Sequence, residues 1–247
     1  MKKLFYTLLI SAMVVVATTS CNKNDSDYSN ASGAVSQISD GDYTINFNYD
    51  SSGRVVNVST NDGESYNFSY DGSTISSTIS YSEPGYWANS LLEVELDSDG
   101  TITTATMEES DSEGDYYESI YTYTSDNGKV TSINADGRNC SVSWSGDDIK
   151  VLDDDVFSPS QYKNDYSIDL NMFLTNSEEI SDLFGGEYFG FNKEIKGIHS
   201  EYLIDECAEE GETYEVIYET NSEGKITKAS WDKYDNGEFN EIYVSYY

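Results

Sequence analysis

Few residues in this sequence could carry acid–base or nucleophilic chemistry, and they are scattered along the chain. His199 is the only histidine, so a histidine-based triad could use no other residue and a zinc site built on several histidines is excluded. In the run Gly197-Ile198-His199-Ser200-Glu201 we expect a surface imidazole, or one with satisfied hydrogen bonds, rather than a catalytic base. Gly185-Gly186 and Gly190 lack the strand and the Gly-Lys-Ser/Thr context of a phosphate-binding loop. We therefore expect no cofactor and no metal site.

Carboxylates are the most abundant reactive groups, with 46 Asp and Glu residues against 13 Lys and Arg residues. A glycosidase-like carboxylate pair is compatible with this composition, but no particular pair stands out, because sequence spacing does not report distance in space. Asp97-Ser98-Asp99-Gly100 is similar to the start of a calcium loop, yet the remaining ligands are missing and the run suits a hairpin turn. The net charge of −33 repels nucleic acid and favours solubility, with a general affinity for divalent cations as the alternative.

Exposed aromatic residues offer a second kind of site, one for binding rather than chemistry. Aromatic rings can stack on the apolar faces of sugars while a phenol or indole keeps a polar contact. The alternative is that these rings fill the sheet or protect its edges, which the high aromatic content of 14% favours. The candidates for ligand stacking are Trp87, Tyr86, Trp231 and Tyr234.

Three cysteines suggest two different roles. Cys140 lies in a strand-like run and Cys207 in an acidic, loop-like segment. Both would remain after export to a compartment where a disulfide can persist, so a bridge between them is one reading and two independent thiols the other. Cys21 differs from both, because small residues precede it and a polar tract follows it.

The first twenty residues predict a lipoprotein signal peptide. Lys2 and Lys3 form a positive start, and Leu4–Ala17 is an uncharged apolar run too short to span a bilayer comfortably. Thr18-Thr19-Ser20 then supplies the small residues that lipoprotein signal peptidase requires before Cys21. We therefore expect removal of residues 1–20 and attachment of acyl chains such as palmitate at Cys21, which together make a durable anchor. An ordinary secretory signal with an incidental cysteine is the alternative.

Residues 21–39 are rich in Ser, Gly and Asn and show no periodicity, which predicts a flexible tether. Residues 40–247 are expected to form one antiparallel β domain, since no second linker appears. Within it a unit recurs: an aromatic strand end, a turn of Asp, Ser, Asn and Gly, and a β-branched residue that resumes the strand. Each copy predicts a hairpin, because Gly supplies the positive φ of a tight turn. The six copies span residues 49–55, 70–75, 96–102, 123–130, 144–149 and 218–226.

The segments between these turns alternate with period two. Tyr43–Tyr49, for example, keeps its large apolar residues on one face, which indicates a sheet with one buried face. Successive hairpins then predict a mainly β fold: a curved antiparallel meander, either an open sheet or a barrel. One stretch breaks the pattern, where Asn176 and Glu179 are spaced as a capping box. We expect a short helix near residues 176–184 that covers one end of the sheet.

These features resemble known families. The unit Tyr49-Asp50-x-x-Gly53-Arg54-Val55 resembles the YD repeat of large Rhs-type shell proteins, which carry many uniform copies. The chain is more similar to a family of Bacteroides-type lipoproteins of unknown function with a porin-like antiparallel β fold. The similarity rests on the hairpin units across 41–150, the Ile168-Asp169-Leu170-Asn171 element, the Gly-rich stretch before Lys193, and the closing hairpin around Gly224-Lys225-Ile226-Thr227. It implies a curved sheet or barrel and brings no known activity.

The expected location is the outer membrane, lipid-anchored and facing the cell surface, with the periplasmic face as the alternative. A barrel that spans the membrane is disfavoured, because one strand face is rich in Ser, Thr, Asn and Asp and the other must form a core. The leading functional hypothesis is a non-catalytic binding module for a glycan or a protein. A carboxylate-dependent hydrolase of glycans is the second, and an assembly protein that pairs through a sheet edge is the third.

Overall fold

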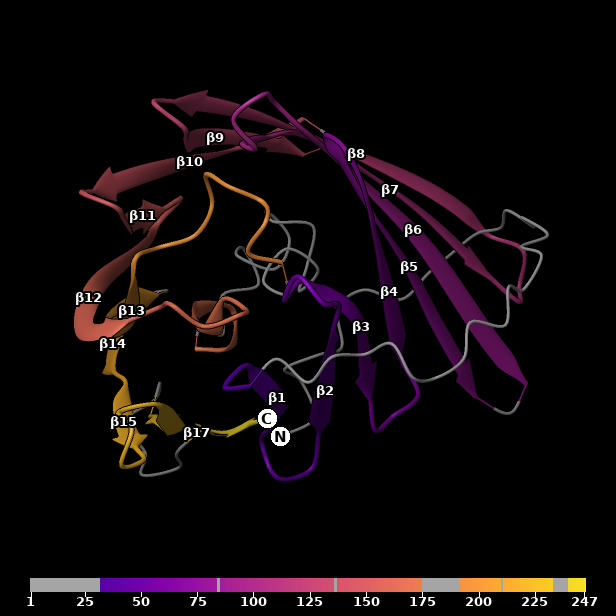
Figure 1. Ribbon diagram of the computed structural model, residues 1–247. Helices are drawn as coiled ribbons and strands as arrows, with labels where there is room; N and C mark the ends of the chain where they lie inside the picture. The colour runs from indigo at the N-terminus through magenta and orange to yellow at the C-terminus, as the bar shows by residue number, and fades with distance from the viewer. Residues whose placement is uncertain (1–31, 84, 136, 175–191, 210, 233–239) are drawn as a thin grey trace.

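A computed structural model describes residues 32–83, 85–135, 137–174, 192–209, 211–232 and 240–247. The described residues form a 17-stranded antiparallel sheet that curls into a nearly closed barrel shape (Figure 1). The fold class expected from the hairpin units is therefore confirmed. The first strands are β1 (Val35–Ser39), β2 (Thr44–Tyr49), β3 (Val55–Thr60), β4 (Ser65–Asp71), β5 (Thr74–Glu83), β6 (Tyr86–Leu96), β7 (Ile102–Asp111), β8 (Tyr116–Asp126) and β9 (Lys129–Ala135). The others are β10 (Arg138–Ser145), β11 (Asp148–Leu152), β12 (Asp155–Lys163), β13 (Tyr202–Glu209), β14 (Glu212–Glu215), β15 (Ile217–Thr220), β16 (Ile226–Trp231) and β17 (Asn240–Tyr246).

The sheet closes because its first strand pairs on both sides. β1 pairs antiparallel with β2 and with β17, so the two ends of the described chain meet in one wall. Elsewhere each strand pairs with the next one along the chain, except at a seam around Val216. There β14 pairs with β13 and β15 pairs with β16, while the Val216 amide donates to the carbonyl of Asp205 at 2.8 Å. β14 and β15 therefore act as one interrupted strand that completes the wall.

The sheet begins earlier than the sequence indicated. Residues 21–39 were expected to be a tether, but Val35 and Ile38 are buried in β1 with 0% and 3% exposure. Strand pairing on both sides and these two apolar side chains outweigh the polar composition around them. The expected signal peptide and Cys21 lie outside the described residues. Among the described residues, no helix is both long and apolar enough to cross a membrane.

All six recurring units form hairpins, and all six lie at the same end of the barrel. They connect β2 to β3, β4 to β5, β6 to β7, β8 to β9, β10 to β11, and β15 to β16. In a meander, every second turn lies at the same end of the sheet. Turns that recur once for every two strands therefore gather at one end. We call this end the hairpin end. Its turns use positive φ where a tight turn needs it, as at Asn127 (φ 52°) and Gly128 (φ 76°).

Alternating residues of each strand point into the barrel and form its core. In β2 the inward residues Ile45, Phe47 and Tyr49 are 2%, 0% and 1% exposed, while the residues between them are only half-buried. Each such apolar side chain stabilises the fold by about 1.5–3 kcal/mol. Tyrosine suits this wall because its hydroxyl can reach a backbone carbonyl from a buried ring, as Tyr49 does to Val35 at 2.7 Å.

The connection from β12 to β13 folds back inside the curve of the sheet (Figure 1). Its described parts, residues 164–174 and 192–201, are called the plug below. The plug contains one short 3-10 helix, η1 (Leu170–Phe173), which Asp169 caps by accepting a hydrogen bond from the Asn171 amide. The helix expected near 176–184 lies outside the described residues. The apolar side chains that the plug buries against the sheet are Ile168, Leu170, Phe173, Leu174, Ile195 and Ile198.

The returning half of the plug docks on the hairpin end. The Lys196 amide donates to the Gly100 carbonyl at 3.0 Å, and the Val130 amide donates to the Gly197 carbonyl at 2.9 Å. These bonds join the plug to the hairpins of β6–β7 and β8–β9. The plug is therefore attached to the wall by backbone hydrogen bonds as well as by apolar packing.

Candidate functional site

The inward faces of β6, β7 and β8 carry polar groups where the strands run past the apolar core. Further toward the core, the same face holds Leu92 and Met107, which are both 2% exposed. Toward the end opposite the hairpins, alternation places tyrosine rings, a hydroxyl and carboxylates on that face instead. We call this group the rim face, which consists of Tyr86, Ser90, Glu109, Asp111 and Tyr117.

Strand pairing brings the rim-face residues together. Ser90 stands directly opposite Glu109, and Glu109 stands directly opposite Tyr117. The Ser90 hydroxyl donates to Glu109 Oε1 at 3.4 Å, and the Tyr86 hydroxyl donates to Asp111 Oδ2 at 3.4 Å. Aromatic and acidic groups from three strands therefore share one surface.

The two carboxylates of the rim face are well buried, Glu109 at 8% and Asp111 at 2% exposure. Burial raises the pKa of the Glu109 carboxyl, which the hydrogen bond from Ser90 only partly offsets. Desolvation and the neighbouring Asp111 carboxylate raise the pKa of the Tyr86 hydroxyl. Tyr86 thus stays protonated as a hydrogen-bond donor, and Glu109 takes up a proton more readily than an exposed glutamate does.

Asp111 also organises the turn between β7 and β8. Its Oδ1 accepts hydrogen bonds from the amides of Glu113 and Gly114 at 2.8 and 3.0 Å, and from Asp115 at 3.4 Å. One carboxylate oxygen from each of Asp111, Glu113 and Asp115 lies within 4.8 Å of the others. Three such ligands fall short of the six to eight oxygens that calcium takes, and Asp111 Oδ1 is already occupied by amides.

A second polar cluster joins the two halves of the plug. Asp169 Oδ2 lies 2.7 Å from His199 Nδ1, and Asp169 Oδ1 accepts from the Asn164 amide group at 2.6 Å. His199 Nε2 lies 3.1 Å from the Asn192 carbonyl oxygen, and the Lys193 ammonium donates to the Asn164 carbonyl at 2.7 Å. Both imidazole nitrogens thus face hydrogen-bond acceptors of the plug.

The neighbours of Asp169 and Lys193 in this cluster shift the pKa values of both side chains. Burial opposes ionisation of Asp169, but Lys193, His199 and the hydrogen bond from Asn164 outweigh it and lower the pKa of Asp169 to about 2. Burial in turn lowers the pKa of the Lys193 ammonium, against the attraction of Asp169.

This arrangement differs from a catalytic triad in one specific respect. In a triad, Nε2 of the histidine takes the proton of the nucleophile, whereas here Nε2 of His199 is occupied by the Asn192 backbone carbonyl. The structure therefore places His199 in the interior as a hydrogen-bonded structural group, one of the two roles that the sequence suggested.

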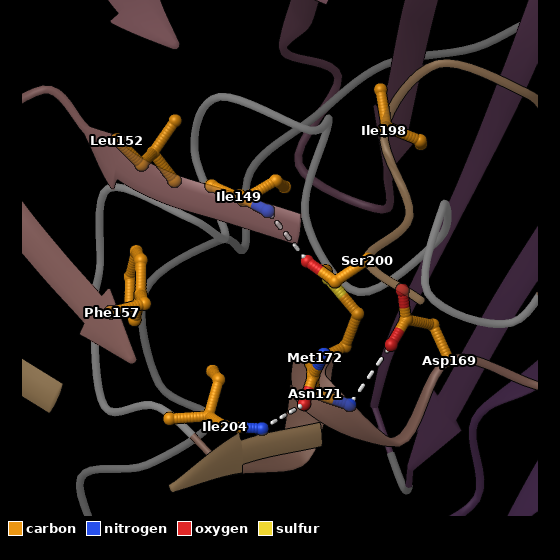
Figure 2. A pocket seen from close by; sticks show the side chains of 9 residues that line it. All are labelled: Ile149, Leu152, Phe157, Asp169, Asn171, Met172, Ile198, Ser200 and Ile204. Carbon is orange, nitrogen blue, oxygen red and sulfur yellow. Dashed lines mark hydrogen bonds between the residues drawn. The ribbon is translucent and has the colours of Figure 1, made fainter. Parts of the chain in front are cut away.

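A small cavity lies beside this cluster, with a volume of about 30 Å³. Figure 2 shows its lining, in which Ser200 accepts a hydrogen bond from the Ile149 amide and Asn171 accepts one from the Ile204 amide. The cavity has room for a water molecule and is too small for a sugar ring. Its lining residues are Ile149, Leu152, Phe157, Asp169, Asn171, Met172, Ile198, Ser200 and Ile204.

Of the four aromatic residues predicted to stack on a ligand, the structure places one on the rim face. Tyr86 is half-buried there, and its ring centroid lies 6.3 Å from that of Tyr81. Trp87 follows Tyr86 on β6 and therefore points to the opposite face. Trp231 is 1% exposed, so its ring belongs to the core, and Tyr234 lies outside the described residues.

Glu109, Asp111 and Tyr117 were not among the site residues predicted from the sequence. Two acids spaced i, i+2 in a strand-like run were the available signal, because that spacing puts both on one face. That signal does not tell which acids meet an aromatic residue of another strand, since this depends on the register between strands.

Cys140 and Cys207 are both fully buried, and no disulfide joins them. Cys140 lies on β10 and Cys207 on β13, with β11 and β12 between them in the sheet. Three strand spacings amount to about 14 Å, whereas the Cα atoms of a disulfide lie within about 7 Å of each other. Of the two readings from the sequence, the structure therefore has the two separate thiols.

Comparison with known proteins defines the fold of this chain. No family model and no curated protein matches it. A solved porin-like protein from Bacteroides uniformis aligns with 87% of this chain and 99% of its own, at 14% identity and a TM-score of 0.51. Another porin-like protein, from Bacteroides vulgatus, shows the same coverage at 10% identity and a TM-score of 0.35. The first similarity supports a porin-like antiparallel β fold, as the sequence resemblance implied.

Proposed function

We propose that this chain is a lipid-anchored binding protein of the cell envelope, which holds a glycan on the rim face without transforming it. The observation that carries the proposal is the meeting of Tyr86, Tyr117, Glu109 and Asp111 on one sheet face. Aromatic rings provide flat apolar surfaces for sugar rings, and carboxylates accept hydrogen bonds from sugar hydroxyls.

The anchor in this proposal is the lipid on Cys21, at the outer membrane and facing the cell surface. About 13 residues separate Cys21 from the start of β1 at Val35, so their extended reach is at most about 45 Å. This length lets the barrel-shaped sheet stand clear of the membrane. The anchored chain, which loses Lys2 and Lys3 with residues 1–20, remains strongly acidic and would also be repelled by anionic lipid.

Two neighbouring residues of β6 provide the test. Binding of the purified full-length chain to an array of bacterial glycans is measured for Tyr86→Ala and for Trp87→Ala, which alters the opposite sheet face. We expect Tyr86→Ala to weaken binding at least tenfold and Trp87→Ala to leave it within about twofold. The opposite ranking, or no glycan bound by the unaltered chain, would refute the proposal.

A second candidate function is hydrolysis of a glycan by Glu109 and Asp111. The observation in its favour is that burial raises the pKa of Glu109, as a general acid requires. Side chains at i and i+2 of one strand lie roughly 7 Å apart, within the range for inverting glycosidases. Asp111 is poorly suited to act as the base, because amides occupy its Oδ1. Release of reducing sugars that disappears in Glu109→Gln would favour this candidate over simple binding.

A further inference from the structure

β8 runs past its neighbour on one side and leaves part of its edge unpaired. Its pairing with β7 extends from Thr122 to Tyr116, but its pairing with β9 stops at Tyr121. In the described part of the chain, no strand covers the other side of Tyr116–Ile120. Because successive residues of a strand direct their N–H and C=O groups to opposite sides, two or three of these five residues present them to the open side. We call Tyr116–Ile120 the free edge.

The free edge exposes an unusual amount of apolar surface. Tyr116, Tyr117 and Ile120 are 54%, 52% and 49% exposed, and they are three of the seven large exposed hydrophobic residues in the described chain. Proteins commonly protect an edge strand with lysine, proline, a bulge or a covering loop. The free edge has neither lysine nor proline, and its pairing with β7 shows no bulge.

The charged residues of the free edge, of the facing position on β7 and of the adjoining turn are all acidic. Glu118, the central residue of the free edge, stands directly opposite Glu108 of β7, and like charges in this position are destabilising. No ion pair in the described residues involves either side chain. The adjoining turn adds the exposed carboxylates of Glu113 and Asp115. A cation placed beside Glu118 would relieve this repulsion.

We propose that the free edge binds an extended, positively charged segment of a partner protein, which adds to the sheet as one more strand. Side chains of an added strand lie beside those of β8 on the same face. The partner would therefore place a lysine or arginine beside Glu118, and apolar residues two positions away on either side beside Tyr116 and Ile120. The recognised pattern is apolar, any residue, basic, any residue, apolar.

A second copy of this chain is a poor occupant of the same edge. An antiparallel pair of free edges centred on Glu118 would set two identical glutamates directly opposite each other, in addition to two Glu108 side chains. Each copy also carries a net charge of −33. Charge complementarity thus selects a basic strand from a different protein.

The test uses the full-length chain and a fluorescent seven-residue peptide, Thr-Val-Thr-Lys-Thr-Val-Thr, with a control peptide that has glutamate in place of lysine. Fluorescence polarisation should show binding of the lysine peptide at least tenfold tighter than the glutamate peptide. Amide hydrogen exchange should show new protection within Tyr116–Ile120. If neither peptide binds, or both bind equally, the proposal is wrong.

A charge exchange at the centre of the edge makes the test specific. Glu118→Lys should weaken binding of the lysine peptide at least tenfold. The variant should then bind the glutamate peptide more tightly than the lysine peptide. This variant removes the repulsion from Glu108, so its thermal midpoint should not fall. The matched control is Glu93→Lys, an exposed glutamate on β6, which should leave both affinities within about twofold. An unchanged preference in Glu118→Lys, or an equal loss in Glu93→Lys, would overturn the proposal.

The free edge shares Tyr117 with the rim face, but the two proposals are tested through different residues. Glu118 points to the outer face of the sheet, and Tyr86 points to the inner face. Loss of glycan binding in Tyr86→Ala with normal peptide binding, or the converse in Glu118→Lys, shows which of the two proposals fails.

Discussion

Asp169 Oδ2 lies 2.7 Å from His199 Nδ1, and this contact joins the outgoing and returning halves of the plug. Thirty residues separate the two side chains in the sequence. Both are largely buried, with side-chain exposures of 4% for Asp169 and 11% for His199. A pair in this position stabilises the docking of the plug. We therefore expect its removal to lower the free energy of unfolding of the whole barrel.

Replacement of His199 should destabilise the protein strongly. His199→Ala removes the imidazole that lies 2.7 Å from the buried Asp169 carboxylate, and breaking a buried pair of this kind typically costs about 3–5 kcal/mol. Urea unfolding followed by tyrosine and tryptophan fluorescence measures the change. As a control, Lys163→Ala breaks the exposed ion pair with Glu201 and should cost less than about 1 kcal/mol. Equal effects of the two replacements would contradict the structural role of His199.

The stability of the fold should depend on pH through Asp169. Its pKa is lowered to about 2 in the folded chain, from a usual value of 3.8. A lowered pKa means that the carboxylate stabilises the fold above about pH 4, and that this contribution is lost as the pH falls toward 2. The amount is on the order of 2 kcal/mol. The free energy of unfolding of Asp169→Asn, measured between pH 2 and 6, should be lower near pH 6 and vary less with pH. An identical pH profile in both chains would rule this origin out.

Replacement of Gly197 by any other residue should lower the stability of the fold strongly. Its φ is +92°, and an added Cβ would lie 2.8 Å from Thr101 Cγ2 and 3.2 Å from the Gly128 carbonyl oxygen. Gly197→Ala therefore combines backbone strain with a clash where the plug meets the wall. Gly53 has a similar φ of +82° but open space around it, so Gly53→Ala isolates the strain of about 1–2 kcal/mol. We expect thermal unfolding to show Gly197→Ala to be less stable than Gly53→Ala by a further 1–3 kcal/mol, approximately.

Cys140 and Cys207 should react as two separate thiols. Their strands are too far apart for a bridge, so a maleimide probe should label both residues in the denatured chain without prior reduction. Peptide mass spectrometry identifies the labelled positions. Labelling that requires a reductant would reveal a disulfide, and would mean that the arrangement of β10 and β13 differs from the one described.

The sequence by itself determined the local structure. Tight turns need residues that tolerate positive φ, and Asn127-Gly128 supplies them between two β-branched, aromatic strands. The alternation of apolar and polar residues in Tyr43–Tyr49 places Ile45 and Phe47 on the same buried face, whichever strand pairs with them. Both features depend on interactions within a few residues, so the pattern of residue types is enough to predict them.

Only the tertiary structure decided which distant residues meet. The polar composition near Val35 suggested a tether, yet pairing with β17 at the far end of the chain makes this segment a strand. Register between strands, rather than spacing along one strand, places Tyr117 opposite Glu109. It also leaves the β9 side of Tyr116–Ile120 unpaired. The same holds for Asp169 and His199, which come together only because the plug folds back into the barrel. These contacts depend on closure of the whole sheet, and no local pattern encodes that closure.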